Sequence, residues 1–247
     1  MRRYDPPAEA GGDDASVAQV VRRALDSAFA AVEQGGAGRR AKRRPTAVLD
    51  AGCGRVSALT RYRPRIGRFV GADIHPPAPG ALPHLDEFAT VDLCTDADAF
   101  PPGTFDVILS SFTVEHFADP SRAFLHLRRW LRPGGRLVIS TVNRRHPFVG
   151  AYLATPERVR RPLQRLVKAS AADAHPLVGA CNDPAAIESA LRAAGFTDVR
   201  VTTVGHLARA WGRRRTTRVL GVVGDLLARG TPSRRSTIVA EAVAPAS

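Results

Sequence analysis

The chain alternates between short continuous apolar runs and longer segments in which apolar residues recur every three or four positions. The short runs are typical of buried strands, and the spaced segments are typical of helices with one buried face. The runs predict seven strands, at residues 46–51, 68–74, 88–93, 105–111, 136–141, 198–203 and 237–243. The spaced segments predict helices at residues 15–32, 55–63, 120–131 and 183–194. This alternation predicts an α/β fold with a doubly wound, seven-stranded, mostly parallel sheet.

The pattern also divides the chain into two regions. Residues 1–45 are expected to form a polar tail, an N-terminal helix and a basic, glycine-rich linker over 34–44. Residues 46–247 are expected to form one ligand-binding domain. Insertions near 144–182 and 205–235 interrupt the alternation, and each contains a basic amphipathic helix, near 157–168 and 218–229. We expect these C-terminal helical insertions to form a cap.

Charge is unevenly distributed along the chain. The net charge is +13, of which residues 144–168 carry +6 and residues 205–235 carry +7. Such segments favour an anionic partner or an anionic membrane surface. The three cysteines lie far apart, which is typical neither of a disulfide framework nor of a zinc site, and no metal ligands are predicted. Without a signal-peptide pattern or an apolar run of roughly 18 residues, the protein is expected to be cytoplasmic, or peripheral to a membrane.

The first predicted strand ends in a turn of small residues, DAGCG, at positions 50–54. Gly52 and Gly54 lack a Cβ, so this turn can adopt unusual dihedral angles and let a ligand approach its backbone. The helix predicted at 55–63 would point free N–H groups at that ligand. The turn therefore predicts a nucleotide-type site.

Three acids, Asp50, Asp73 and Asp92, follow the first three predicted strands, whose carboxyl ends form the ligand crevice of a doubly wound sheet. Asp73 follows Gly54 by 19 residues, about the offset at which an acid binds ribose hydroxyls. One such acid is more often a turn or cap residue, but three in this register indicate a site. A dinucleotide oxidoreductase would need glycine at Ser57, and Asp50 would repel a pyrophosphate. Asp50 instead suits a ligand with ammonium and sulfonium groups, which favours S-adenosylmethionine.

Four motifs, VLDAGCG, GADI, FDVILSSFTVEHFADP and LRPGGRLVIST, occur in this order along the chain. Together they resemble the successive motifs of class I S-adenosylmethionine-dependent methyltransferases, in particular the type 11-like group. The resemblance covers residues 46–142 and, less closely, 183–204. It implies a Rossmann-like fold, S-adenosylmethionine as cofactor and transfer of a methyl group, with oxygen as the expected acceptor atom.

The resemblance also implies roles for individual residues. Asp50 would lie near the amino group of the cofactor, Asp73 would hold the ribose hydroxyls, and Asp92 with Leu93 would contact the adenine. The remaining residues expected to bind the cofactor are Gly52, Cys53, Gly54, Ile74, Ser110, Ser111 and Phe112. Val56 stands where the family commonly has a third glycine, which is expected to narrow the pocket or shift the following helix.

A general base is needed only if the acceptor must lose a proton. The candidates are His116 with Glu115 after the fourth strand, His146 after the fifth, and His175 in the first insertion. Glu115 and His116 are equally compatible with ordering the cofactor pocket, or with a helix-start acid beside a packed histidine. His146 lies at a strand end, a position that commonly faces substrate.

The acceptor is less well defined by the sequence. We expect a small-molecule, glycan or lipid-linked acceptor held by the cap, with the cap's apolar face packed on the domain or lying on an anionic membrane. An RNA methyltransferase is the second hypothesis, but aromatic residues are only 6% of the chain, which leaves few platforms for stacking bases. A non-catalytic domain of the same fold, suggested by Val56, is the third.

Overall fold

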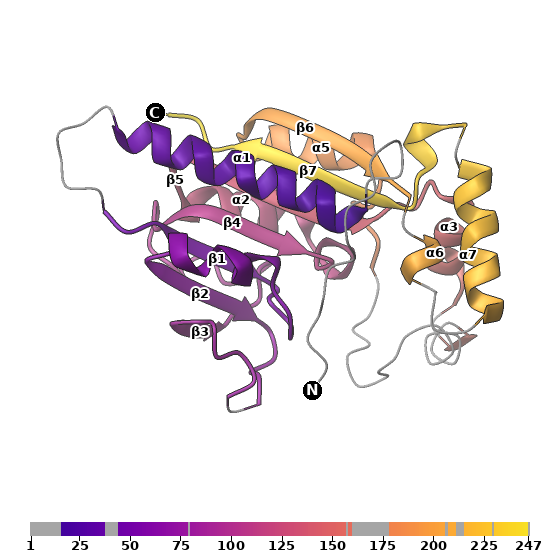
Figure 1. The fold of residues 1–247 in the computed structure, drawn as a ribbon, viewed down its shortest axis with the longest axis horizontal. Helices are drawn as coiled ribbons and strands as arrows, with labels where there is room; N and C mark the ends of the chain where they lie inside the picture. Colours follow the sequence, from indigo (N-terminus) through magenta and orange to yellow (C-terminus); the bar gives the residue numbers. More distant parts are fainter. Residues whose placement is uncertain are drawn as a thin grey trace.

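The computed structural model describes residues 16–37, 44–78, 80–156, 158–159, 178–205, 207–210, 215–228 and 230–246. Seven strands form one sheet in the order β3-β2-β1-β4-β5-β7-β6 (Figure 1). Their bounds are β1 Ala47–Ala51, β2 Arg68–Asp73, β3 Glu87–Thr90, β4 Phe105–Ser111, β5 Leu131–Val142, β6 Thr197–Val204 and β7 Thr237–Val243. The first five strands are parallel, and β7 runs antiparallel to β5 and β6. The predicted doubly wound, mostly parallel sheet of seven strands is confirmed.

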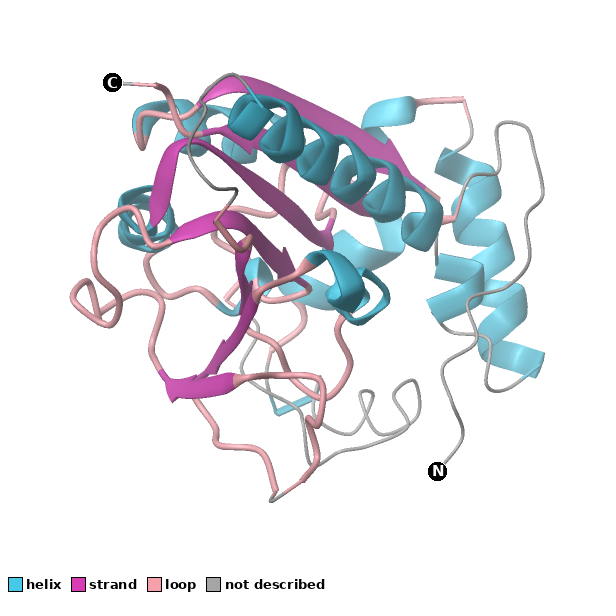
Figure 2. Cartoon of the chain, turned by 60° about the vertical axis from the view of Figure 1, so that its left-hand side comes forward, coloured by secondary structure: helices cyan, strands magenta, loops and turns pink. Residues whose placement is uncertain are grey.

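Helices cover both faces of the sheet, because the central strands have apolar side chains on both faces. On β1, Val48 packs beneath α1 (Val17–Ala37) and Leu49 packs on the opposite face. That opposite face is covered by α2 (Pro120–Trp130) and α5 (Pro184–Ala193). Figure 2 shows the long helix α1 lying across its face of the sheet. Both faces of β1 are therefore buried, which explains its continuous apolar sequence.

The helix predicted at 55–63 is wrong in type and position. The chain instead forms a 3₁₀ helix, η1 (Ala58–Arg65), which contains Pro64. The Ser57 hydroxyl accepts the Leu59 N–H at 3.1 Å, so a side chain of the protein already takes one of the donors expected to face the ligand. Ser57 as N-cap sets the later start of this helix, and Pro64, which has no N–H to donate, favours a short one.

The first helix is longer than predicted and includes residues 34–37 of the expected linker. Contacts with η1 hold its last turns, because Phe29 stacks on Tyr62 with ring centroids 4.7 Å apart and Glu33 pairs with Arg65. Tertiary contacts here outweigh the low helix propensity of the glycines. Strand boundaries also differ, since β3 ends before Asp92 and β5 begins at Leu131, directly after α2.

Three further helices, α3 (Pro147–Ala154), α6 (Leu207–Ala210) and α7 (Arg215–Ala228), come from the two predicted insertions. They gather at one end of the molecule, beyond the sheet (Figure 1), and are called the cap below. Apart from residues 158–159, the helix predicted near 157–168 lies outside the described residues, as does His175. No helix in the described part of the chain is long and apolar enough to cross a bilayer.

Candidate functional site

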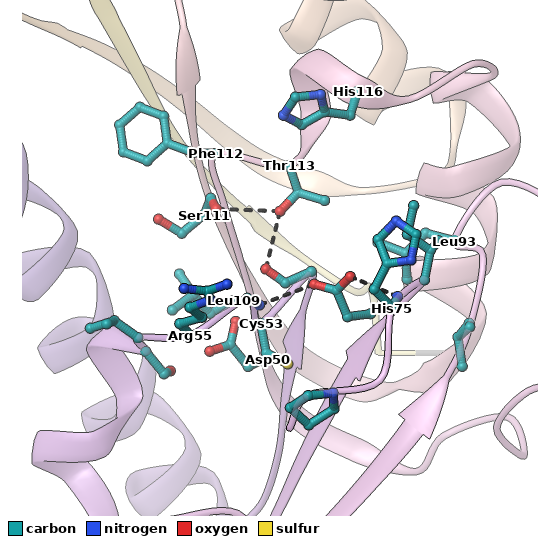
Figure 3. Close-up of a pocket in the computed structure, with 18 of the residues that line it drawn as sticks. Asp50, Cys53, Arg55, His75, Leu93, Leu109, Ser111, Phe112, Thr113 and His116 are labelled. Carbon is teal, nitrogen blue, oxygen red and sulfur yellow. Dashed lines mark hydrogen bonds between the residues drawn. The ribbon is translucent and has the colours of Figure 1, made fainter. Parts of the chain in front are cut away.

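A cavity of about 980 Å³ opens at the carboxyl ends of β1, β2 and β4 (Figure 3). Ten of the eleven residues expected to bind the cofactor line it. They are Asp50, Gly52, Cys53, Gly54, Asp73, Ile74, Asp92, Leu93, Ser111 and Phe112. The parallel topology brings these residues together, because it places the ends of neighbouring strands at one edge.

The glycine turn forms the part of the wall that follows β1. Gly52 has φ +77° and Gly54 has φ +48°, both in the left-handed region that favours glycine. A Cβ on Gly52 would lie 2.2 Å from the Thr113 Oγ1, whereas a Cβ on Gly54 would meet no atom within 4 Å. Gly52 therefore serves close packing against the end of β4, and Gly54 leaves backbone open to the cavity.

Asp50 lies at the base of this turn and is only 2% exposed. Burial raises its pKa to about 7, the nearby Asp73 adds to the rise, and a hydrogen bond from the Ser57 side chain opposes it. Its Oδ2 has no hydrogen-bond partner. An ionised carboxylate in this position requires a cationic partner, because burial without one is costly.

Cys53 follows in the same turn and is also buried. Burial, with Asp50 and Asp73 close by, raises the pKa of its thiol to about 12. The thiol is therefore protonated near neutral pH and is a lining group, not a nucleophile.

Asp73 and Asp92 each accept backbone hydrogen bonds from the turns that follow their strands. Asp73 accepts from the N–H groups of Gly54 at 3.0 Å and His75 at 3.2 Å, and Asp92 accepts from that of Cys94 at 2.8 Å. Both acids thus shape turns, as isolated strand-end acids commonly do. They also line the cavity, and a carboxylate has further lone pairs for a ligand.

The end of β4 forms the opposite wall. The Ser111 hydroxyl hydrogen-bonds to that of Ser140 at 2.8 Å. Phe112 has φ +52° and lines the cavity, where its side chain is 39% exposed (Figure 3). Ser110 is fully buried and does not line the cavity, which corrects its expected contact with the cofactor. Successive side chains of a strand point to opposite faces, so Ser110 and Ser111 cannot both face the cavity.

Glu115 and His116 separate after the end of β4. His116 lines the cavity and lies on the side away from Asp50 (Figure 3). Glu115 is buried, and its Oε2 accepts a hydrogen bond from the Thr141 hydroxyl at 2.7 Å. The Glu115 carbonyl also accepts the N–H groups of Val178 and Gly179. His116 is therefore placed to contact a ligand. Glu115 instead holds this segment through buried hydrogen bonds outside the cavity.

The comparison with known families agrees with this geometry. A family model described as a methyltransferase domain matches residues 18–201, which is most of the chain. The chain belongs to the class I S-adenosylmethionine-dependent methyltransferases. The cofactor of this family is S-adenosylmethionine, as the glycine turn and its acids predicted.

Proteins similar to this chain include O-methyltransferases. Over 168 residues it is 33% identical to a nocamycin O-methyltransferase of Saccharothrix syringae, covering 62% of this chain and 60% of the relative. Over 124 residues it is 35% identical to a ubiquinone biosynthesis O-methyltransferase of Cereibacter sphaeroides, covering 48% of this chain and 50% of the relative. The matched parts therefore span about half of each relative's length.

Solved structures share the fold of this chain at low identity. A Haloferax volcanii methyltransferase in complex with the Trm112 activator aligns with a TM-score of 0.54 at 20% identity, covering 92% of this chain and 94% of that one. A Haemonchus contortus phosphoethanolamine N-methyltransferase aligns with a TM-score of 0.52 at 17% identity, covering 89% and 52%. These likenesses establish the fold alone.

His146, expected to contact substrate, is instead fully buried and absent from the cavity wall. Its Nδ1 accepts the Val149 N–H at 3.4 Å, which makes it the N-cap of α3. Its ring packs against Gly224 of α7, and burial lowers its pKa. The structure therefore corrects the expected direct contact between His146 and substrate. The ring instead joins α3 to α7 in the cap.

Other lining residues were not predicted. Thr113, which follows β4, packs against Gly52 in the turn after β1 and lines the cavity. His75 and Arg55 also line the cavity. No local pattern distinguishes them, because their places depend on how strands distant in sequence pair. Val56, which was expected to narrow the pocket or to shift the following helix, lines the cavity and is 68% exposed.

Proposed function

We propose that this methyltransferase transfers a methyl group to a hydroxyl oxygen of an apolar small-molecule or lipid-linked acceptor. The main support for a cofactor site is Asp50. This buried acid lines a large cavity, and its Oδ2 has no hydrogen-bond partner. The volume of about 980 Å³ lies at the upper end of the usual range for small-molecule sites, about 300–1,000 Å³. Such a volume fits both a cofactor and a small acceptor.

A second buried acid shows what Asp50 lacks. Asp106, at the start of β4, accepts hydrogen bonds from the guanidinium groups of Arg44 and Arg132 and from the Ala47 N–H. That acid is fully satisfied by the protein, as buried polar groups usually are. The Asp50 Oδ2 would be satisfied by the ammonium group of the cofactor, so the residues present fit S-adenosylmethionine.

The remaining acids suit the other end of the cofactor. Asp73 is an acceptor-only group with lone pairs to spare, so it suits two neighbouring ribose hydroxyls. Asp92 and Leu93 lie in the same wall beyond β3 and suit the adenine. We assign Ile74, which is 48% exposed at the cavity, to the apolar surface beside the sugar and base.

When bound, S-adenosylmethionine supplies a methyl group on a positively charged sulfur, which is already an activated leaving group. The protein then contributes mainly by orientation, for which effective molarities of about 10⁵–10⁸ M are known. His116 is the residue we assign to take the proton of the acceptor hydroxyl, because among the predicted bases that the structure describes it is the one that lines the cavity. Glu115 and Thr141 hold the segment that carries His116.

The apolar character of the acceptor rests on the rim of the cavity. Val56 and Phe112, neither of which is assigned to the sugar or base of the cofactor, are 68% and 39% exposed, and both line the cavity. An apolar acceptor would cover such surface, whereas a polar one would not. Oxygen as the acceptor atom is supported by the nocamycin and ubiquinone relatives, both of which are named as O-methyltransferases.

Methyl-label transfer tests this proposal. The purified protein is incubated with methyl-labelled S-adenosylmethionine and a fractionated extract of its host, with Asp50→Asn as the control for a disabled cofactor site. Label in the organic fraction that is lost in the variant supports the proposal, and label in a nuclease-sensitive fraction replaces it with the RNA hypothesis. If no label appears, calorimetry with S-adenosylhomocysteine decides whether the site binds cofactor, and failure to bind contradicts the assignment.

A further inference from the structure

Helix α7 is arranged with its small residues inward and its large apolar residues outward. Gly221, Gly224 and Ala228 are buried against the rest of the cap. The outward residues are Val219, Leu220, Val222, Val223, Leu226 and Leu227, which are 41% to 62% exposed. An amphipathic helix on a soluble surface normally has the opposite arrangement.

Close backbone contacts fix the inner face of α7. A Cβ on Gly221 would lie 2.7 Å from the Ala208 Cα, and one on Gly224 would lie 2.8 Å from the His146 ring. Asp225 accepts the N–H groups of Leu207 at 3.2 Å and Ala208 at 2.9 Å, which caps α6. Turning α7 to bury its leucines would break these hydrogen bonds and force side chains into backbone. The outward direction of the apolar residues is therefore built into the cap.

The exposed side chains form a single broad stripe. At 100° per residue, positions 219, 220, 222, 223, 226 and 227 span an arc of about 160° on the helix. The inward positions 221, 224, 225 and 228 occupy the opposite arc. Six large apolar residues on one helix form a continuous patch, which marks a surface covered by another molecule or by lipid.

The net positive charge of the segment that contains α7 favours an anionic partner. Residues 205–235 contain eight arginines and one acid. The acid is Asp225, which points inward to cap α6, so no acid of this segment belongs to the apolar stripe. Arg218 is exposed at the edge of the stripe. Two copies of this face would bring like charges together, whereas an anionic surface would attract them.

We propose that α7 lies in the surface of an anionic lipid bilayer, with its apolar stripe among the acyl chains and Arg218 at the headgroups. An exposed apolar stripe flanked by basic residues is the pattern of an interfacial helix, whose binding adds apolar burial to attraction for anionic lipids. Figure 1 places α7 on the outside of the cap, at one end of the molecule. This inference goes beyond the proposed function and does not depend on which acceptor is methylated.

Vesicle flotation tests the inference with matched variants. The protein is mixed with vesicles of phosphatidylcholine alone, or of phosphatidylcholine with phosphatidylglycerol, at low and high ionic strength. The variant Leu220→Asp/Leu227→Asp changes the stripe, and Leu125→Asp changes a leucine on α2 that is 51% exposed. Melting temperatures of all three proteins report whether the exposed substitutions leave the fold intact.

We expect the wild type and Leu125→Asp to float with the anionic vesicles, more strongly at low ionic strength because salt screens the arginines. The stripe variant should partition at least about tenfold less, because two leucines no longer enter the apolar layer. The inference is overturned if the wild type does not float with anionic vesicles at low ionic strength, or if the stripe variant floats equally well. A wild-type dimer that the stripe variant converts to monomer, without vesicle binding, would instead assign this face to a second copy.

Discussion

The Asp73 Oδ2 accepts a hydrogen bond from the Gly54 N–H at 3.0 Å, which ties the end of β2 to the glycine turn after β1. The same carboxylate accepts the His75 N–H through its other oxygen. In the proposed function, this one side chain would both set the turn along the cofactor and accept hydrogen bonds from its ribose hydroxyls. Asp73 would then couple the geometry of the glycine turn to cofactor binding.

Asp73→Asn should weaken S-adenosylhomocysteine binding about ten- to a hundredfold, because hydrogen bonds to a charged acceptor are worth about 1.5–3 kcal/mol. Isothermal calorimetry measures this change. Asp98→Asn is a matched control, since its side chain is 87% exposed and does not line the cavity. Equal affinities for the two variants would contradict the assignment of Asp73 to the ribose.

The raised pKa of Asp50 predicts proton release when the cofactor binds. Below about pH 7 the free acid is protonated, whereas a bound ammonium group favours the carboxylate. Affinity should therefore rise with pH up to about 7 and then level off. Calorimetry in buffers of different ionisation enthalpy detects the released proton, and Asp50→Asn should abolish it together with most of the affinity.

The same shift predicts a gain in stability for the free Asp50→Asn protein at alkaline pH. The acid has a higher pKa folded than unfolded, so the folded wild type binds more protons and loses stability as pH rises from about 4 to 7. Asparagine does not titrate, so the variant does not lose stability over this pH range. Thermal melts without ligand above pH 7 should give a higher melting temperature for the variant, and a lower one would show that Asp50 is already well satisfied in the free protein.

The sequence predicted the sheet well because each central strand is buried on both faces and ends in a recognisable turn. The acids at the strand ends came together because parallel pairing aligns those ends, for instance Asp50 beside Gly71 of β2 and Leu109 of β4. Such positions follow from periodicity and chain order alone.

The failures lie where the position of a side chain depends on distant packing. His146 caps α3 and packs against Gly224, 78 residues further along the chain, so its strand-end location gave no indication of its burial. Thr113 fills the space above Gly52 for the same reason. The helix expected after the glycine turn became η1, which starts later because Ser57 is its N-cap and contains Pro64, which cannot donate a backbone hydrogen bond.

Gly52→Ala should be more damaging than Gly54→Ala, although both glycines have positive φ. Alanine at Gly54 meets only backbone strain, about 1–2 kcal/mol. Alanine at Gly52 meets the same strain and a Cβ that would lie 2.2 Å from the Thr113 Oγ1. Urea unfolding should therefore show the larger loss of stability for Gly52→Ala, and the reverse order would contradict the packing at the end of β4.

His116→Gln should lower turnover by about 10²–10⁴-fold, the usual contribution of a general base, with little change in S-adenosylhomocysteine affinity. His75→Gln is the matched variant, because it replaces the other described histidine that lines the cavity. A full loss of turnover in His75→Gln with none in His116→Gln would move the proton acceptor to His75. Steady-state kinetics on the acceptor found by label transfer, with calorimetry alongside, separates these outcomes.

His146 should make the stability of the protein depend on pH in the acid range. Burial lowers its pKa below the usual 6.5, while Asp225 and the Gly224 backbone oppose the shift. The unfolded state then binds more protons between the two pKa values, so the contribution of His146 is full above about pH 6.5 and is lost as pH falls below it, by at most about 1.4 kcal/mol per pH unit. In His146→Asn, asparagine can still accept the Val149 N–H as an N-cap but does not titrate. Thermal melts between about pH 7 and pH 5 should fall less steeply for the variant than for the wild type, and parallel curves would show that His146 is readily protonated within the folded cap.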